Sequence, residues 1–462
     1  MKWYVPIWTA LAACALMASQ ALAYQPQLED PSPPRALDEE DADDGDDKPA
    51  YLDESYDDVL QPDCYCEEPA ADASCAAEEP ACGFEPGCEC EGGCTSGCDG
   101  CDLGDAWTLQ SYLTPCCDSP TYGGWFQMGY HSDNTGQSSQ TGDLLDFNDV
   151  PDRLRLHQAW VYTEKLAEAD ACSADWGYRF DILYGTDAQK TQAFGNTGAP
   201  NAQGWDNDWD HGVYGWAIPQ LYGEIGYGDW SVKVGHFFTP LGYEVIPATG
   251  NFFYSHALTM FNSEPFTHTG VLGTYKGYDN ATVYAGWTLG WDTGYDQFGD
   301  GNSWLGGMTY EMSDNLSVTY LSTAGNFGFR SGDEPGYSHS IVLAADLTDS
   351  WKYVFQSDYV RTAGSFGDPD AEGEDVGVNQ YLFYTINDCW SVGGRAEWWK
   401  SNVAPFNPGE STSYYEITGG INYRPHANIV FRPEIRYDWS PTDFDDPDYN
   451  RTIFGIDMVC TF

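Results

Sequence analysis

Cysteine thiols are the most reactive groups in this sequence, and eleven of its 15 cysteines fall between residues 64 and 117. Spacings such as Cys94-x3-Cys98-x2-Cys101 could bind a metal, but the stretch contains no histidine and matches no standard zinc module. In an exported chain, disulfides within or between molecules are the favoured chemistry. The cysteines concerned are Cys64, Cys66, Cys75, Cys82, Cys88, Cys90, Cys94, Cys98, Cys101, Cys116 and Cys117.

Histidine and aspartate side chains suggest two other kinds of site. Scattered histidines could activate a serine, but no H-E-x-x-H or G-x-S-x-G motif is present, so we expect no enzyme. Two acidic runs could bind Ca²⁺, but neither has EF-hand spacing, so we expect no metal site and no cofactor. The residues considered were His157, His236, His256 and His268, and Asp206, Asp208, Asp210, Asp443, Asp445, Asp446 and Asp448.

The N-terminal region explains why oxidation is expected. Residues 1–23 resemble a signal peptide, with Lys2 before an apolar stretch and an Ala-Leu-Ala cleavage site at 21–23. A lipobox-like sequence ending at Cys14 leaves lipidation as an alternative. Residues 24–121 are acidic, rich in Cys and poor in large aliphatic residues. They cannot bury enough apolar surface to offset their ordering entropy, which predicts a disordered spacer.

The chain ends in a strand pattern that runs to its last residue. In residues 450–462 one face is apolar, whereas the other carries Arg451 and Asp457. An ordinary edge strand could show this alternation. A strand closed by a C-terminal phenylalanine resembles the signal by which the barrel-assembly machinery binds bacterial outer-membrane β-barrels. The apolar face consists of Phe454, Ile456, Met458, Cys460 and Phe462.

Residues 122–462 contain sixteen candidate strands of this kind. Long and short connections alternate between them, as in an up-and-down antiparallel barrel with loops at one end and periplasmic turns at the other. The spacer would then lie in the periplasm; fourteen or eighteen strands are alternatives. The segments are 122–131, 152–165, 174–186, 213–227, 229–240, 266–276, 279–291, 302–313, 314–323, 336–348, 349–362, 375–387, 388–400, 412–424, 426–439 and 450–462.

Apolar and charged residues occupy opposite faces of these segments. In 174–186, Trp176 and Phe180 share one face, and Arg179 and Asp181 share the other. Apolar faces rich in Trp and Tyr suit contact with outer-membrane lipid, and charged faces suit a water-filled interior. The sequence therefore predicts an all-β transmembrane barrel.

The net charge of −53 argues against nucleic-acid binding, which needs clusters of Lys and Arg.

Three stretches resemble a known family. They are 175–187 (D-W-G-Y-R-F-D-I-L-Y-G-T-D), 232–244 (V-K-V-G-H-F-F-T-P-L-G-Y-E) and 251–255 (N-F-F-Y-S). Residues 122–462 are similar to the OmpL-like β-barrel porin family of bacterial outer membranes. The resemblance implies a passive pore for small hydrophilic solutes and ions, and it leaves open whether the barrel forms a homotrimer. The alternative function is a structural or adhesive surface barrel with a closed lumen, cross-linked through its cysteine-rich segment.

The connection 241–265 is long, aromatic and nearly free of charge, unlike the other long connections. By resemblance to sixteen-stranded porins it should fold into the lumen; packing on the rim or on a neighbouring subunit is the alternative. Inward basic residues would face acidic residues across the narrowed pore, with weak cation preference overall because acidic residues predominate. The predicted pore-lining residues are Arg153, Arg155, Arg179, Arg432, Arg436, Glu244, Glu264, Phe252, Phe253 and Tyr254.

The C-terminal pattern generates the first testable prediction. Deleting Phe462 should reduce the amount of assembled barrel in outer-membrane fractions, because the assembly signal is lost. The full chain should fractionate with outer membranes and migrate as a heat-modifiable band on gels. Normal assembly of the deletion variant, with the full chain recovered in soluble extracts, would contradict the barrel prediction.

Overall fold

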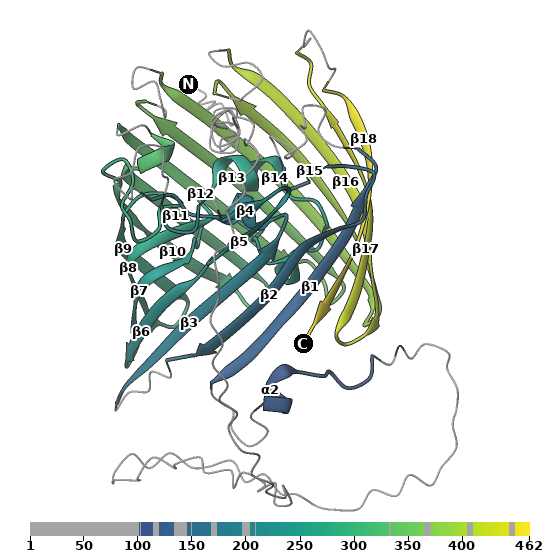
Figure 1. Ribbon diagram of the computed structural model, residues 1–462, viewed down its shortest axis with the longest axis horizontal. Coiled ribbons are helices and arrows are strands. Elements are labelled where there is room, and N and C mark those ends of the chain that lie inside the picture. The colour runs from purple at the N-terminus through teal and green to yellow at the C-terminus, as the bar shows by residue number, and fades with distance from the viewer. Residues whose placement is uncertain are drawn as a thin grey trace, which may run out of the picture.

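The computed structural model describes residues 101, 103–113, 120–133, 146–148, 150–167, 173–195, 204–207, 209–331, 334–364, 371–403, 410–442 and 449–462. Within these ranges the chain forms a closed antiparallel β-barrel with a few short helices (Figure 1). No helix in this part of the chain is long and apolar enough to cross a membrane.

The elements follow one another in an up-and-down order around the barrel. The strands are β1 (Thr121–His131), β2 (Arg155–Lys165), β3 (Ala174–Gly185), β4 (Asp210–His211), β5 (Tyr214–Ala217), β6 (Leu221–Tyr227), β7 (Trp230–Phe238), β8 (Thr267–Tyr278), β9 (Ala281–Thr288), β10 (Asn302–Ser313), β11 (Leu316–Asn326), β12 (Pro335–Asp346), β13 (Trp351–Thr362), β14 (Gly373–Asn387), β15 (Trp390–Ser401), β16 (Thr412–His426), β17 (Ile429–Trp439) and β18 (Arg451–Thr461). The helices are α2 (Leu109–Leu113), α3 (Ala188–Thr191), η1 (Ala248–Gly250), α4 (Leu258–Ser263) and η2 (Gly328–Arg330).

The wall of the barrel has sixteen strand positions in the described residues, which confirms the predicted number. β3 pairs with β5 at one end and with β6 at the other, so these two strands share one position, and β4 pairs only with β5. The predicted strand 213–227 is thus interrupted after Ala217. Pro219 has no N–H to contribute to the ladder, and the N–H of Ile218 donates to the carboxylate of Asp206 instead.

The barrel closes where β18 pairs with β1, the seam between the two ends of the barrel sequence. Met128 lies opposite Met458 in this pairing. Gly124 and Phe462 exchange two backbone hydrogen bonds of 3.0 and 2.9 Å, so the last residue extends the ladder beyond β18. A Cβ atom on Gly124 would lie 2.2 Å from the carbonyl oxygen of Trp160. The seam therefore needs glycine at the point where Phe462 pairs.

Polar side chains are buried inside the barrel and apolar side chains are exposed outside it. Asp181 and Arg436 are both 0% exposed, whereas the outward Trp176 and Ile435 are 60% and 59% exposed. A soluble barrel would show the opposite arrangement. The predicted faces are confirmed, and the outer surface suits lipid.

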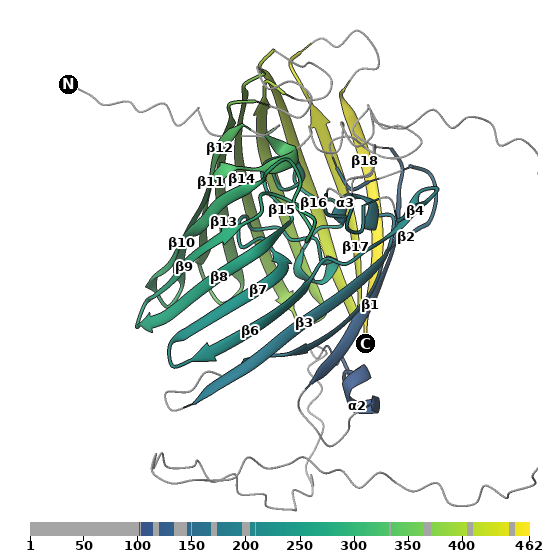
Figure 2. The same cartoon turned by 60° about the vertical axis from the view of Figure 1, so that its left-hand side comes forward.

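The two ends of the barrel differ in their connections (Figure 2). Short turns such as 228–229, 279–280, 388–389 and 427–428 join strands at one end, here called the turn end. Longer connections join strands at the other end, here called the loop end. The C-terminus and α2 both lie at the turn end (Figure 1).

Apolar clusters occupy part of the barrel interior. One cluster joins Trp125 and Trp160 of the wall to Phe261 of the connection between β7 and β8. Another lies among loop-end connections, where the rings of Phe194 and Phe329 stack with centroids 4.0 Å apart. The interior is therefore narrowed by packed side chains both near its middle and at the loop end.

Candidate functional site: the loop inside the barrel

The connection between β7 and β8 packs against the inner face of the wall, and we call residues 241–265 the docked loop. It contains η1 and α4. Near its start, Leu241 packs with apolar residues of β7, β8, β10 and β11, and later residues contact β13 to β18, β1 and β2. The docked loop therefore crosses the interior from one side of the barrel to the other.

Three consecutive aromatic side chains of the docked loop fit where the wall lacks side chains. Three inward-facing glycines lie in one row across the wall: Gly393 of β15 pairs with Gly420 of β16, and Gly455 of β18 follows after Glu434 of β17. A Cβ atom at Gly393 would lie 2.6 Å from the ring of Phe252, closer than carbon atoms pack. The contacts are Phe252 with Gly393, Phe253 with Gly420, and Tyr254 with Gly455 and Gly129.

Three glutamates accept hydrogen bonds from five backbone N–H groups of the docked loop. Glu434 and Glu397 are wall residues and are 4% and 5% exposed, and Glu244 belongs to the loop itself. Hydrogen bonds to carboxylates are stronger than those between neutral groups. The N–H groups are those of Tyr254 (2.9 Å) and Ser255 (3.1 Å) to Glu434, Ala257 (2.8 Å) to Glu244, and Leu258 (2.6 Å) and Thr259 (2.6 Å) to Glu397.

Three arginines donate to carbonyl groups of the same loop. Arg395 lies on β15, and Arg432 and Arg436 lie on β17; all are at most 2% exposed. The carbonyls are those of Ala248 and Asn251 with Arg432 (both 2.8 Å), Ser255 with Arg395 (2.9 Å) and His256 with Arg436 (2.7 Å).

Each of these buried guanidinium groups is neutralised by carboxylates, which a buried charge requires. Arg395 contacts Glu416 and Glu244, each at 2.8 Å. Arg432 contacts Asp457 at 2.5 Å, and Arg436 contacts Asp438 and Asp146. Burial raises the pKa of Glu244, but Arg395, His256 and the N–H of Ala257 together outweigh burial and lower this pKa to about 2. Glu244 is thus ionised, and its contacts persist, throughout the neutral and mildly acidic range.

The hydroxyl of Tyr254 attaches the docked loop to β2 by a hydrogen bond. It lies 2.7 Å from Nε2 of His157, whose Nδ1 lies 2.9 Å from the hydroxyl of Thr186. The neighbouring Gln158 donates to the carbonyl of Ile246 and accepts from the N–H of Ala248. Backbone and side chains of the docked loop are therefore fixed on both sides of the closing seam.

A cavity of about 720 Å³ opens on the turn side of the docked loop. Tyr243 and Phe252 of the loop form part of its lining. Lys352 of β13 and Arg424 of β16 also line it, and within the described residues neither is within ion-pair distance of a carboxylate. A smaller cavity of about 100 Å³ lies beside Arg424 and Arg432. Arg424 is thus a cationic group that borders open space inside the barrel.

The structure brings some of the predicted pore-lining residues together and separates others. Those at the docked loop and its contacts are Arg432, Arg436, Glu244, Phe252, Phe253 and Tyr254. Glu264, after α4, accepts from Gln356 of β13. Arg179 pairs with Glu164 and Asp181. Arg155 is the first residue of β2, and the exposed Arg153 lies in the connection before it.

The predicted arrangement of charges across an open gap needs correction. Arg432 and Arg436 are covered by the docked loop, and each has its own carboxylate partner. Glu244 does not face them across a gap, because it contacts Arg395 directly. The reason is that loop backbone groups inside a barrel need partners, and the arginines supply them.

Sequence reasoning missed Arg395, Glu397, Glu434 and Arg424. The alternating pattern of the predicted strands could have indicated them, because all four occupy inward positions of that pattern. Within the described residues, no group of His, Cys, Asp and Glu side chains is arranged to hold a metal ion. Asp206 accepts from backbone N–H groups, and Asp210 from Gln192. The residues Asp208, Asp443, Asp445, Asp446 and Asp448 lie outside the described residues.

The glycine contacts generate a prediction with a matched control. Gly393→Val should displace Phe252 and lower the stability of the assembled barrel by about 1–3 kcal/mol, as overpacking does. Gly394→Val, one residue along the same strand, faces outward, where only the oxygen of Thr418 lies within 4 Å, at 3.9 Å. Heat-unfolding rates and proteolysis within 241–265 measure the difference. Equal behaviour of the two variants would show that Phe252 does not occupy this place.

No curated protein matches the chain significantly. The outer membrane channel DcaP of Acinetobacter baumannii superimposes with a TM-score of 0.50 at 13% identity, covering 74% of this chain and 96% of that one. An anion-selective porin from Comamonas acidovorans gives 0.47 at 10% identity, covering 74% and 99%. DcaP shows the fold alone, and the second is too distant to support an argument. Residues 120–462 match the family described as "Putative beta-barrel porin-2, OmpL-like", and the chain belongs to this family of outer-membrane β-barrel porins.

Proposed function

We propose that the protein lets small hydrophilic solutes and ions diffuse passively across the outer membrane, with the docked loop setting the width of the path. The observation that carries this proposal is the fixed position of the loop inside the barrel. Four of its N–H groups and four of its carbonyls bind charged side chains of the wall, so it cannot move freely out of the interior. A passive pore needs such a fixed constriction to exclude larger solutes.

The proposed orientation places the turn end in the periplasm. In outer-membrane barrels the short turns are periplasmic and the long loops extracellular. Residues 103–113, which belong to the acidic cysteine-rich segment, contact the turn end beside Phe462. The acidic segment would therefore lie on the periplasmic side of the membrane and join the barrel at its turn end.

A closed lumen is the second candidate, and the packed interior favours it. Trp125, Trp160 and Phe261 belong to one buried cluster, and Phe194 and Phe329 to another at the loop end. If these clusters block the lumen, the protein is a structural or adhesive surface barrel. Electrical conductance separates the two candidates directly.

Conductance in planar bilayers gives the test of pore function. The full chain should form ohmic channels, and deletion of residues 250–262 should raise the single-channel conductance several-fold, because the aromatic part of the docked loop is removed. Channels of unchanged conductance in the deletion variant would show that the loop is not the constriction. Absence of conductance in both proteins would support the closed barrel.

Ion selectivity is proposed to depend on Arg424, which has no carboxylate partner among the described residues, with weak cation preference overall. Arg424→Ala should shift the reversal potential in a salt gradient toward cations, because a positive charge beside the 720 Å³ cavity is lost. Arg432→Ala should act mainly on conductance, since Arg432 is covered and holds the docked loop. Arg361→Ala is the control, as Arg361 is exposed and pairs with Glu372. An equal shift for Arg361 and Arg424 would mean that only the overall charge matters.

A further inference from the structure

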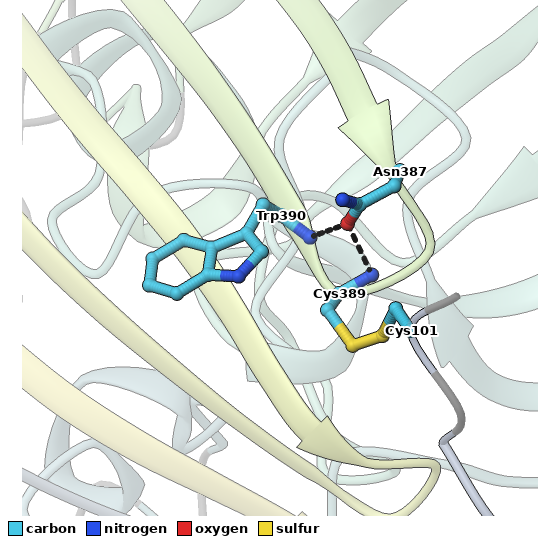
Figure 3. The surroundings of a disulfide bond; sticks show 4 residues. All are labelled: Cys101, Asn387, Cys389 and Trp390. Carbon is cyan, nitrogen blue, oxygen red and sulfur yellow. Dashed lines mark hydrogen bonds between the residues drawn. A yellow bond between two sulfur atoms is a disulfide. The ribbon is translucent and has the colours of Figure 1, made fainter. Parts of the chain in front are cut away.

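Cys101 forms a disulfide with Cys389, and this bond joins the N-terminal segment to the barrel 288 residues later. The Cα atoms are 5.8 Å apart, within the usual range for a disulfide. Cys389 lies in the turn between β14 and β15. There the side-chain oxygen of Asn387 accepts the N–H groups of Cys389 and Trp390, both at 3.0 Å (Figure 3). The turn therefore holds the Cys389 backbone in place independently of the disulfide.

Residues 103–113 continue from the disulfide across the turn end. The carbonyl of Leu103 accepts the N–H of Ala427, in the turn between β16 and β17. The side chain of Asn428 accepts the N–H of Trp107 at 2.8 Å and donates to its carbonyl at 2.7 Å. The same side chain donates to the carbonyl of Thr461 at 2.9 Å. One amide group thus joins the N-terminal segment to the last strand.

The segment also reaches the other side of the closing seam. The ring of Trp107 lies 6.5 Å from that of Phe462, and the side-chain oxygen of Gln110 accepts the N–H of Tyr122 at 2.9 Å. The contacts therefore run from the β14–β15 turn, past the end of β18, to the start of β1. We call Cys101 and residues 103–113 the strap.

We propose that the Cys101–Cys389 disulfide fastens the strap across the closing seam and locks the assembled barrel. The partners of the strap come together only when β18 has paired with β1, so the complete strap can close only on a finished barrel. This inference does not depend on whether the lumen conducts.

The chemistry is thiol–disulfide exchange with a disulfide donor, either an exported protein disulfide or a small-molecule disulfide. One thiolate attacks the donor, and a mixed disulfide forms with release of one donor thiol. The second cysteine thiolate then attacks this mixed disulfide. The Cys101–Cys389 bond forms, two protons leave the cysteines overall, and the two electrons reduce the two sulfur atoms of the donor to thiols.

The expected effect of the lock is on unfolding. A cross-link between residues so far apart in sequence strongly restricts the opened chain, and the strap adds hydrogen bonds on both sides of the seam. Adding dithiothreitol to the assembled wild type should therefore speed heat unfolding on gels by about tenfold or more. Peptide mapping without reductant should recover a peptide pair joining Cys101 and Cys389.

Serine variants identify which cysteines cause the effect. The C101S/C389S double variant should unfold at the rate of the reduced wild type, with no further response of this size to dithiothreitol. C460S is the control, because Cys460 is a free cysteine and should leave the wild-type rate and response unchanged. The same reductant measurement on wild type covers the case in which the double variant fails to assemble.

Two results would overturn the proposal. One is that, in the oxidised and assembled wild type, Cys389 is either free and alkylated or joined to a cysteine other than Cys101. The other is an assembled C101S/C389S variant that keeps both the wild-type unfolding rate and its response to dithiothreitol. In that case the response would come from other disulfides, and the strap would not lock the seam.

Discussion

A chain segment inside a β-barrel has no neighbouring strand to take its backbone hydrogen bonds, and this constraint determines the interior of the molecule. Buried N–H and C=O groups without partners are costly. Here the wall residues Glu434 and Glu397 accept N–H groups of the docked loop, and Arg395, Arg432 and Arg436 bind its carbonyls. Charged residues on the inner wall therefore serve first as partners for backbone groups.

Burying these charges creates a second requirement, because an unpaired buried ion is costly. Asp457 and Glu416 neutralise Arg432 and Arg395 from neighbouring strands, and Asp438 neutralises Arg436 from the same strand. Space is the third requirement, and the inward glycines beside Phe252, Phe253 and Tyr254 provide it. The paired charges are not free to attract solutes. Arg424 borders a cavity and has no such partner in the part of the chain that the structure describes, so it is the better candidate for selectivity.

Much of the fold could be predicted, because alternation of apolar and polar residues has a direct physical cause in lipid outside and polar groups inside. All sixteen predicted strands have counterparts, with the break near Pro219 as the main difference. The site was harder to predict. Arg432 was expected to face open space, yet it is 2% exposed. The alternation of apolar and polar residues predicts which face of the wall a side chain lies on, but it does not predict which other residues cover that side chain. Cys101 could not be paired with Cys389 from spacing, because only the closed barrel brings the turn end and the strap together.

Backbone hydrogen exchange in the assembled barrel tests most directly whether charged wall residues hold the loop inside. The informative amides are those of Tyr254, Ser255, Leu258 and Thr259, which donate to the wall residues Glu434 and Glu397. If the loop is docked as described, these amides exchange as slowly as strand amides of β17. Exchange at the rate of exposed connections would contradict the central claim, because the loop would then spend much of its time away from the wall.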